Sequence, residues 1–188
     1  MSYTTTSYGT WTNKVNQYST SPDADVLDCI NGGDSDWREL LEKSGALDEI
    51  KQAYRAAIER ALPDSVSLCG DEFIGPAHPE DGEFDDYPVD DDGRLDFAGC
   101  IEGIDLDEII EWHDPVTLED IGRDELKSTA KEPDKAASRA MSRLGVKAFY
   151  HGPNPDSGRI QSYFRTGEVR DALAKRLGKG NRTASTAA

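Results

Sequence analysis

Residues 133–177 read PDKAASRAMSRLGVKAFYHGPNPDSGRIQSYFRTGEVRDALAKRL. Proline suits the first position of a helix and glycine the position just past its end, so Pro133 and Gly145 are expected to bracket one helix. At about 100° per residue, this helix has two chemically different faces. The face expected to pack holds Ala136, Ala137, Ala140, Met141 and Leu144, and the other holds Lys135, Ser138, Arg139, Ser142 and Arg143.

Three cations on the polar face recur at every fourth residue. Lys135, Arg139 and Arg143 occupy positions i, i+4 and i+8, with no acidic residue in the row. Cations spaced in this way lie along one side of a helix, where they can meet phosphates or base edges. The alternative is an ordinary amphipathic helix whose cations only keep it soluble, and both interpretations fit the sequence.

The residues after this helix predict a hairpin and a last helix. Residues 146–150 alternate in the manner of a strand, a turn-rich loop covers residues 152–158, and residues 160–164 are the expected returning strand. Thr166 is expected to cap the last helix. The buried stripe of that helix would consist of Val169, Ala172, Leu173 and Leu177.

This last third of the chain resembles the small winged helix-turn-helix domains of the excisionase and MerR type common in actinobacteria. The residues that carry the likeness are Arg143, Leu144, Gly145 and Val146 at the end of a helix, a wing that ends at Arg159, and Tyr163, Phe164, Arg165, Glu168, Val169 and Ala172 at the start of the next helix. In those domains a compact helix-turn-helix precedes the wing. Here the polar residues 122–132 separate residues 118–121 from Pro133. The resemblance implies a DNA-binding role.

Charge divides the chain into two unequal parts. Residues 1–120 hold 30 Asp and Glu against 7 Lys and Arg, a net charge of −23, whereas residues 121–188 hold 7 against 14, a net charge of +7. Such a sequence describes an acidic body with a basic end. We therefore predict an α+β protein with a helix-rich acidic domain over residues 1–115, a small winged-helix-like domain over residues 116–180 and a disordered tail over residues 181–188.

Within the acidic body, apolar periodicity and cap signals predict helices near residues 8–18, 22–31, 36–44, 47–61 and 106–112. Strand-like residues follow the fourth helix at 66–74, and a small antiparallel hairpin is expected where residues 87–89 precede an Asp-Gly turn and residues 95–97 follow it. One core is expected to contain Tyr54, Ile58, Phe73, Val89 and Leu95.

The sequence offers no recognisable catalytic, metal or cofactor site. Cys69, His78, Cys100 and His113 lack the short spacing of a zinc site, and the acidic turn around Gly93 lacks two ligand positions of a calcium loop. Nucleotide-binding and nucleophile motifs are also absent from the sequence. We therefore expect no catalytic residue, no metal and no cofactor, and a protein that is not an enzyme.

Cysteine usage and hydropathy indicate the compartment. Cys29, Cys69 and Cys100 are odd in number and each has apolar neighbours, so buried free thiols are expected rather than disulfides. The chain has no apolar run of about 18 residues and no signal peptide at its start. We expect a cytoplasmic protein with no membrane partner.

The leading hypothesis is a DNA-binding accessory or regulatory protein that acts by occupancy. Lys135, Arg139 and Arg143 would contact the major groove and its phosphates, while Arg159 and Arg165 would hold the DNA backbone. The acidic body would bind a protein partner or mask the basic helix. The alternative hypothesis is an acidic decoy that mimics nucleic acid and captures a basic partner, as anti-restriction proteins do.

Overall fold

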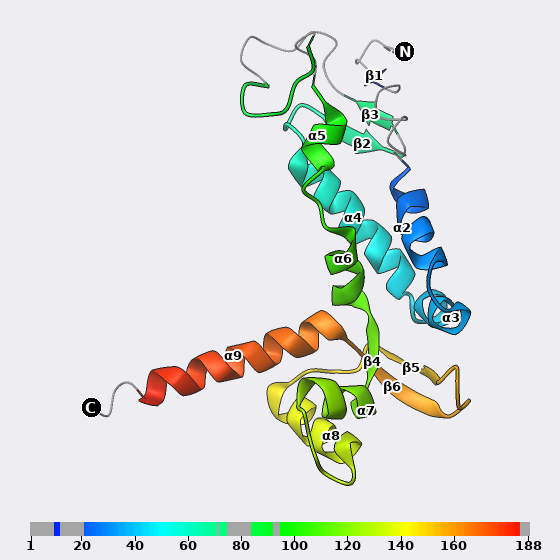
Figure 1. Ribbon diagram of the computed structural model, residues 1–188, viewed down its shortest axis with the longest axis vertical. Helices are drawn as coiled ribbons and strands as arrows, with labels where there is room; N and C mark the ends of the chain where they lie inside the picture. The colour runs from blue at the N-terminus through cyan, green and yellow to red at the C-terminus, as the bar shows by residue number, and fades with distance from the viewer. Residues whose placement is uncertain (1–9, 12–20, 71, 75–83, 92–94, 185–188) are drawn as a thin grey trace. The chain divides into compact units, whose positions relative to one another are not determined.

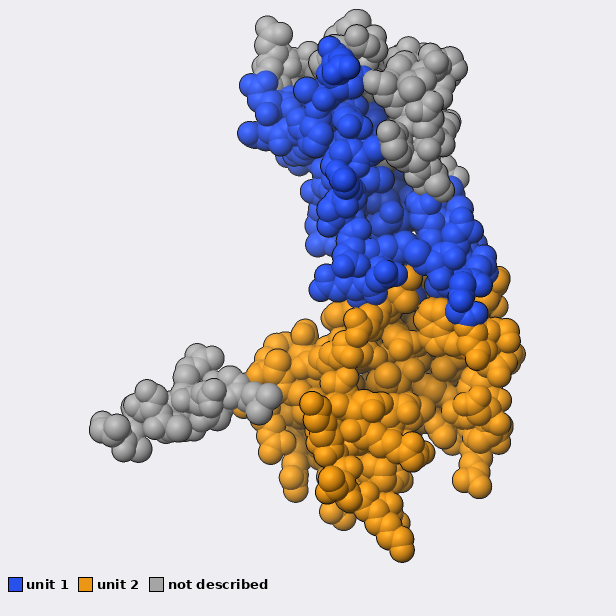
Figure 2. Space-filling model, in the orientation of Figure 1, with its two compact units in different colours: residues 1–33, 50–109 blue, residues 34–49, 110–188 orange. Residues whose placement is uncertain are grey.

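The computed structural model describes residues 10–11, 21–70, 72–74, 84–91 and 95–184. This part of the chain is an α+β protein, rich in helices and with small antiparallel sheets (Figure 1). Its contacts divide it into two compact units (Figure 2). Unit 1 comprises residues 1–33 and 50–109, and unit 2 comprises residues 34–49 and 110–188. These units differ from the expected division after residue 115, because residues 34–49 belong with the C-terminal part.

Unit 1 is organised around two helices, α2 (Pro22–Asn31) and most of α4 (Ala46–Ala61). Pro63 follows α4 closely and prevents its continuation. A small sheet has the order β1 (Thr10–Trp11), β3 (Glu72–Ile74), β2 (Ser67–Cys69), and α5 (Phe97–Ile101) and the first part of α6 (Leu106–His113) come later in the chain. Besides Pro22 and Pro63, the buried side chains of this unit are Val26, Ile30, Ile50, Tyr54, Ile58, Leu62, Val66, Phe84, Leu95 and Phe97.

The expected core of the acidic body is confirmed in part. Tyr54, Ile58 and Leu95 are buried, but Val89 is 49% exposed, so its assignment to the core is wrong. Val89 does pair with Leu95 in an antiparallel bridge, as the predicted hairpin requires, yet this bridge is isolated. A single bridge forms no sheet face that a second layer could cover. The side chain of Phe73 lies outside the described residues.

Two other expectations for unit 1 need correction. Residues 10–11 form a strand where a short helix was predicted, and the rest of that predicted helix lies outside the described residues. Cys29 is an exposed free thiol and Cys100 is half-buried, whereas burial was expected for both. Val26 and Ile30 form the buried stripe of α2, and Cys29 points away from that stripe.

Unit 2 combines a three-stranded sheet with helices. Its strands are β4 (Pro115–Thr117), β5 (Tyr150–Pro153) and β6 (Ile160–Arg165), and its further helices are α3 (Ser35–Ser44), α7 (Leu118–Asp120), η1 (Ile121–Glu125), α8 (Pro133–Leu144) and α9 (Thr166–Ala184). The antiparallel sheet has the order β4-β6-β5, so β6 is the central strand. A buried cluster of Ile121, Ala137, Met141, Phe164 and Val169 joins η1, α8, β6 and α9.

The helix that the sequence predicts most clearly is confirmed as α8. It begins at Pro133 and ends before Gly145, which adopts a left-handed conformation with φ of 74°. The amide of Val146 bonds back to the carbonyl of Met141, a typical closing contact of this cap. The first strand of the hairpin begins at Tyr150 rather than at residue 146, because residues 146–149 connect the helix cap to the sheet.

The residues around the expected domain boundary form an edge strand, β4. Val116 in β4 pairs with Phe164 in β6, and the side chain of Thr117 then begins α7 by accepting a bond from the Asp120 amide. The helical segment continues through η1 to Glu125, so only residues 126–132 separate it from α8. Two helical segments joined by seven residues therefore precede the hairpin.

The start of α9 also differs from the expected cap. Thr166 is the first residue of this helix, is buried, and its hydroxyl donates to the carbonyl oxygen of Asp114 at 3.0 Å. The helix runs to Ala184, beyond the point where a disordered tail was predicted to start, and residues 185–188 lie outside the described residues. None of the helices in the described chain is long and apolar enough to cross a membrane.

A methyl group at Gly122 tests the close approach between η1 and α8. A Cβ at this position would lie 2.3 Å from the carbonyl oxygen of Pro133 and 2.6 Å from its carbonyl carbon, both backbone atoms. We therefore expect Gly122→Ala to lower the free energy of unfolding by about 3 kcal/mol, the upper part of the usual range for overpacking. Urea denaturation followed by circular dichroism measures this loss.

The matched control is Gly103→Ala, because a Cβ at Gly103 would have no atom within 4 Å. Its effect should stay within about 0.5 kcal/mol, as at other open surface positions. Equal stability of the two variants would contradict the close packing of η1 on α8.

Candidate nucleic-acid interface

Packing determines which face of α8 reaches solvent. Ala137 and Met141 are buried in the cluster of unit 2, and the partly buried Ala140 and Leu144 pack against it. The close contact of Gly122 with Pro133 limits movement at the start of the helix. The opposite face is exposed throughout, as predicted, and it consists of Lys135, Ser138, Arg139, Ser142 and Arg143.

The three cations of this face do not have equal surroundings. Lys135 forms an exposed ion pair with Glu132 at 2.8 Å, with 61% and 58% of the two side chains accessible. Arg139 and Arg143 are exposed, and among the described residues no carboxylate forms an ion pair with either. An exposed pair such as Lys135–Glu132 opens at little cost. All three cations can therefore meet an anionic surface.

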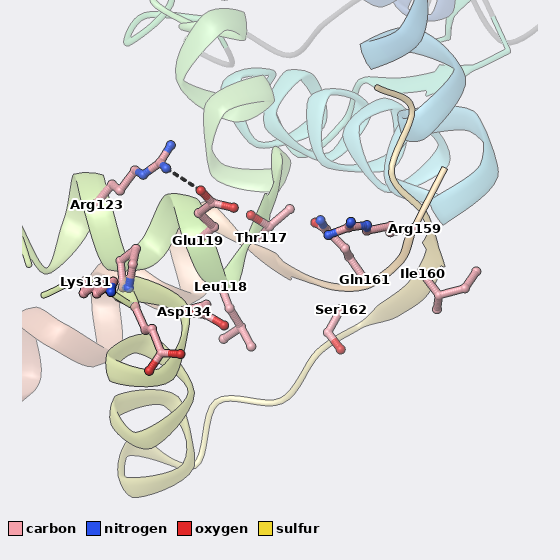
Figure 3. Close-up of a pocket in the computed structure, with 12 residues that line it drawn as sticks. Thr117, Leu118, Glu119, Arg123, Lys131, Asp134, Arg159, Ile160, Gln161 and Ser162 are labelled. Atoms are coloured by element: carbon pink, nitrogen blue, oxygen red, sulfur yellow. Dashed lines mark ion pairs between the residues drawn. The ribbon is translucent and has the colours of Figure 1, made fainter. Parts of the chain in front are cut away.

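Arg159 lies at the end of the loop between β5 and β6. That loop is closed by hydrogen bonds from the Asn154 amide to the Arg159 carbonyl and from the Gly158 amide to the Asn154 carbonyl, both 2.8 Å long. The Arg159 side chain is exposed and lines a pocket that Lys131 and Asp134, near the start of α8, also line (Figure 3). The structure thus brings Arg159 and the beginning of α8 to the walls of one pocket.

Arg165 has a different position from the other four predicted cations. Its side chain is only 18% exposed and donates to both carboxylate oxygens of Glu49, at 2.7 Å and 2.5 Å. It also donates to Glu168 at 3.1 Å, and its guanidinium lies over the ring of Phe149 at 4.3 Å. These contacts occupy the guanidinium within the fold and leave it little access to an external phosphate.

The surroundings of Arg165 form a titratable cluster. Hydrogen bonding to Arg165 lowers the pKa of Glu49. His113 contacts Glu49 at 3.3 Å, and burial lowers the pKa of this histidine despite the nearby carboxylate. Burial raises the pKa of Asp114, whose carboxylate accepts a bond from the Trp37 indole at 2.7 Å. Three ionisable groups whose pKa values the fold shifts, Glu49, His113 and Asp114, therefore belong to unit 2.

The sequence analysis missed several cations beside α8. Lys127 and Lys131 lie in the short connection before α8, Lys147 follows its C-terminal cap, and all three side chains are exposed. Arg123 in η1 is also exposed and pairs with Glu119 at 2.5 Å. Their basic character was visible in the sequence, but residues 122–132 were interpreted as a polar stretch that separates two segments.

The net charge of unit 2 is small although its surface charges are segregated. The unit holds 17 Asp and Glu against 16 Lys and Arg, whereas unit 1 holds 20 against 5. Six of the acids of unit 2 lie within residues 34–49, and α8 holds one exposed acid, Asp134 in its first turn. The attraction of the exposed face of α8 for anions therefore depends on local arrangement and not on net charge.

Comparison of the chain with protein-family models, curated proteins and solved structures finds no match. Among the described residues, no three His, Cys, Asp or Glu side chains form a group that could hold a metal ion.

Replacing Glu49 with glutamine tests the cluster around Arg165. The change removes the anion and leaves Arg165 largely desolvated, so we expect the free energy of unfolding at pH 7 to fall by about 1–3 kcal/mol, between the values for exposed and buried pairs. The pKa of Glu49 is lowered in the folded state, so its stabilisation is complete above its ordinary pKa of 4.5 and disappears as the pH falls through the folded value. Stability should therefore decline less steeply below pH 4.5 in Glu49→Gln.

Glu111→Gln is the control, because Glu111 pairs with Arg170 while 60% and 48% of their side chains are exposed. This variant should lose less than about 1 kcal/mol at pH 7. Urea denaturation between pH 3 and pH 8 compares the two, and a Glu49 variant as stable as the Glu111 variant would refute the role given to Arg165.

Proposed function

We propose that unit 2 is a DNA-binding module of the winged helix-turn-helix type and that the protein acts in the cytoplasm by occupying DNA rather than by catalysis. The observation that carries the proposal is the exposed face of α8, on which Arg139 and Arg143 have no carboxylate partner among the described residues. Cations that are not already neutralised release counterions from DNA when they bind phosphates, which favours association.

The order of elements around α8 supports the same proposal. The helical segment α7–η1, the turn of residues 126–132, α8 and the β5–β6 hairpin follow one another in the chain. In the winged helix-turn-helix domains that the sequence resembles, the second helix enters the major groove. In this proposal, Lys135, Arg139 and Arg143 contact the groove and its phosphates, and Arg159 holds the backbone from the hairpin loop.

The acidic unit 1 has a separate place in the proposal. With 20 acidic against 5 basic residues it repels DNA, so it would bind a protein partner with a basic surface or compete with DNA for the cations of unit 2. The same excess of acidic residues favours a second candidate function, in which the protein is a decoy that mimics nucleic acid and captures a basic protein. The two functions differ in whether the full chain binds DNA.

The double variant Arg139→Ala/Arg143→Ala tests the DNA interface. Both side chains are exposed, so folding should change by no more than about 0.5 kcal/mol per residue. Affinity for a mixed-sequence DNA duplex, measured by fluorescence anisotropy between 50 and 200 mM salt, should fall. A plot of log affinity against log salt should also be shallower for this variant. Its slope should be smaller in magnitude by up to about 1.8, because each lost phosphate contact removes about 0.9.

The control variant Arg38→Ala/Arg60→Ala changes the net charge equally, at the half-buried Arg38 of α3, which pairs with Glu42, and at the exposed Arg60 of α4. It should bind DNA as the unmodified chain does. Equal losses in the two double variants would mean that total charge, and not the face of α8, governs binding. A full chain that ignores DNA even at 50 mM salt would refute the proposed function and favour the decoy.

A further inference from the structure

The pocket lined by the start of α8 and by the β5–β6 hairpin contains a carboxylate, that of Asp134, which the described part of the chain leaves without a partner. Two other acids in the same lining have partners. Glu119 pairs with Arg123 at 2.5 Å, and Glu132 pairs with Lys135 at 2.8 Å. Asp134 is exposed, and its side chain points from α8 into the pocket (Figure 3). Its carboxylate is therefore free to accept hydrogen bonds from a bound molecule.

Two cations accompany this carboxylate. Lys131, from the connection before α8, and Arg159, from the hairpin loop, line the same pocket. Neither of them forms an ion pair with any carboxylate among the residues that the structure describes. Both can therefore meet DNA phosphates, whereas Asp134 repels any phosphate placed beside it. An anion at this place weakens binding to every DNA sequence unless it meets a hydrogen-bond donor.

The position of Asp134 also has a purely structural explanation. It lies in the first turn of α8, where the helix dipole favours a negative charge. That effect stabilises the helix in the free protein and is the same for every DNA sequence. A dependence of Asp134 variants on the identity of one base pair therefore separates a role in reading DNA from the structural role.

Asp134 is the second residue of α8, the helix that the proposed function places in the major groove. The N-terminal residues of such a helix are the ones that contact base edges. In the major groove guanine and thymine present acceptors, adenine presents an amino donor beside the N7 acceptor, and cytosine presents only its N4 amino donor. A carboxylate only accepts hydrogen bonds, so cytosine is the base that suits it best.

We propose that Asp134 accepts a hydrogen bond from the N4 amino group of a cytosine in the major groove and so makes binding sequence-specific at that base pair. The inference rests on the proposed DNA-binding role of unit 2. Lys131 and Arg159 supply an attraction that is independent of sequence. Beside cytosine the carboxylate gains a donor, whereas beside guanine or thymine it faces another acceptor.

Selection of duplexes with a randomised centre by the full chain, followed by sequencing, identifies the preferred site. One position of that site should hold a cytosine whose replacement by any other base lowers affinity about tenfold, a value at the lower end of the range for a specific base contact. Fluorescence anisotropy with the selected duplex and its three single-base variants measures this ratio.

Two substitutions change what the side chain at this position reads. Asp134→Ala removes the acceptor, so the four duplexes should bind within about twofold of one another, and the three without cytosine should bind more tightly than they bind the unmodified chain. Asp134→Asn offers a donor and an acceptor, the pattern that pairs with adenine, so the adenine duplex should bind most tightly. Because Asp134 is exposed, both variants should fold.

Glu132→Gln is the matched control. It removes the same charge two residues earlier in the chain, from an exposed carboxylate that Lys135 already holds. Its preference for cytosine should stay within about twofold of that of the unmodified chain, since this carboxylate makes no base contact in the proposal. The comparison separates loss of charge from loss of the base contact.

Unchanged selectivity among the four duplexes in Asp134→Ala or Asp134→Asn would overturn the inference, as would a selected site without such a cytosine. An equal rise in affinity for all four duplexes would also overturn it, because Asp134 would then only repel phosphates. DNA binding that Arg139→Ala/Arg143→Ala weakens and Asp134→Ala leaves unchanged would refute this inference alone. A full chain that ignores DNA would refute the proposed function and this inference with it.

Discussion

The arrangement of unit 2 depends on the contact between the guanidinium of Arg165 and the carboxylate of Glu49. These residues are 116 positions apart, so their two hydrogen bonds join the start of α4 to the end of the central strand β6. Glu168 and the ring of Phe149 hold the same guanidinium from other sides. Because Arg165 is largely withdrawn from solvent, loss of Glu49 would leave a charge that water cannot readily stabilise.

This contact has a consequence for the other cations. With β6 held in place, Phe164 on that strand packs with Ala137 and Met141, and the opposite side of α8 must face solvent. The arginines on that side then stand apart from the carboxylates of residues 34–49. Unit 2 can thus attract an anionic partner locally while its total charge stays close to zero.

Local sequence signals predicted α8 well, because Pro133 and Gly145 fix its ends through their own backbone preferences and its alanines mark the packed face. The edge strand β4 could not be predicted in this way. It has three residues, and its partner Tyr163–Arg165 lies more than 45 positions further along the chain. The same limitation explains Arg165, whose sequence neighbours indicate a basic surface but whose partner Glu49 comes from a distant helix.

The central claim is that the exposed face of α8 and the loop before β6 form the surface that meets DNA. Amide hydrogen exchange of the full chain, measured by mass spectrometry with and without a mixed-sequence duplex at low salt, tests it most directly. The account predicts slower exchange on DNA binding in peptides covering residues 133–145 and 154–160, with little change in α2 and α4. Protection confined to α2 and α4, or equal exchange everywhere with and without DNA, would contradict it.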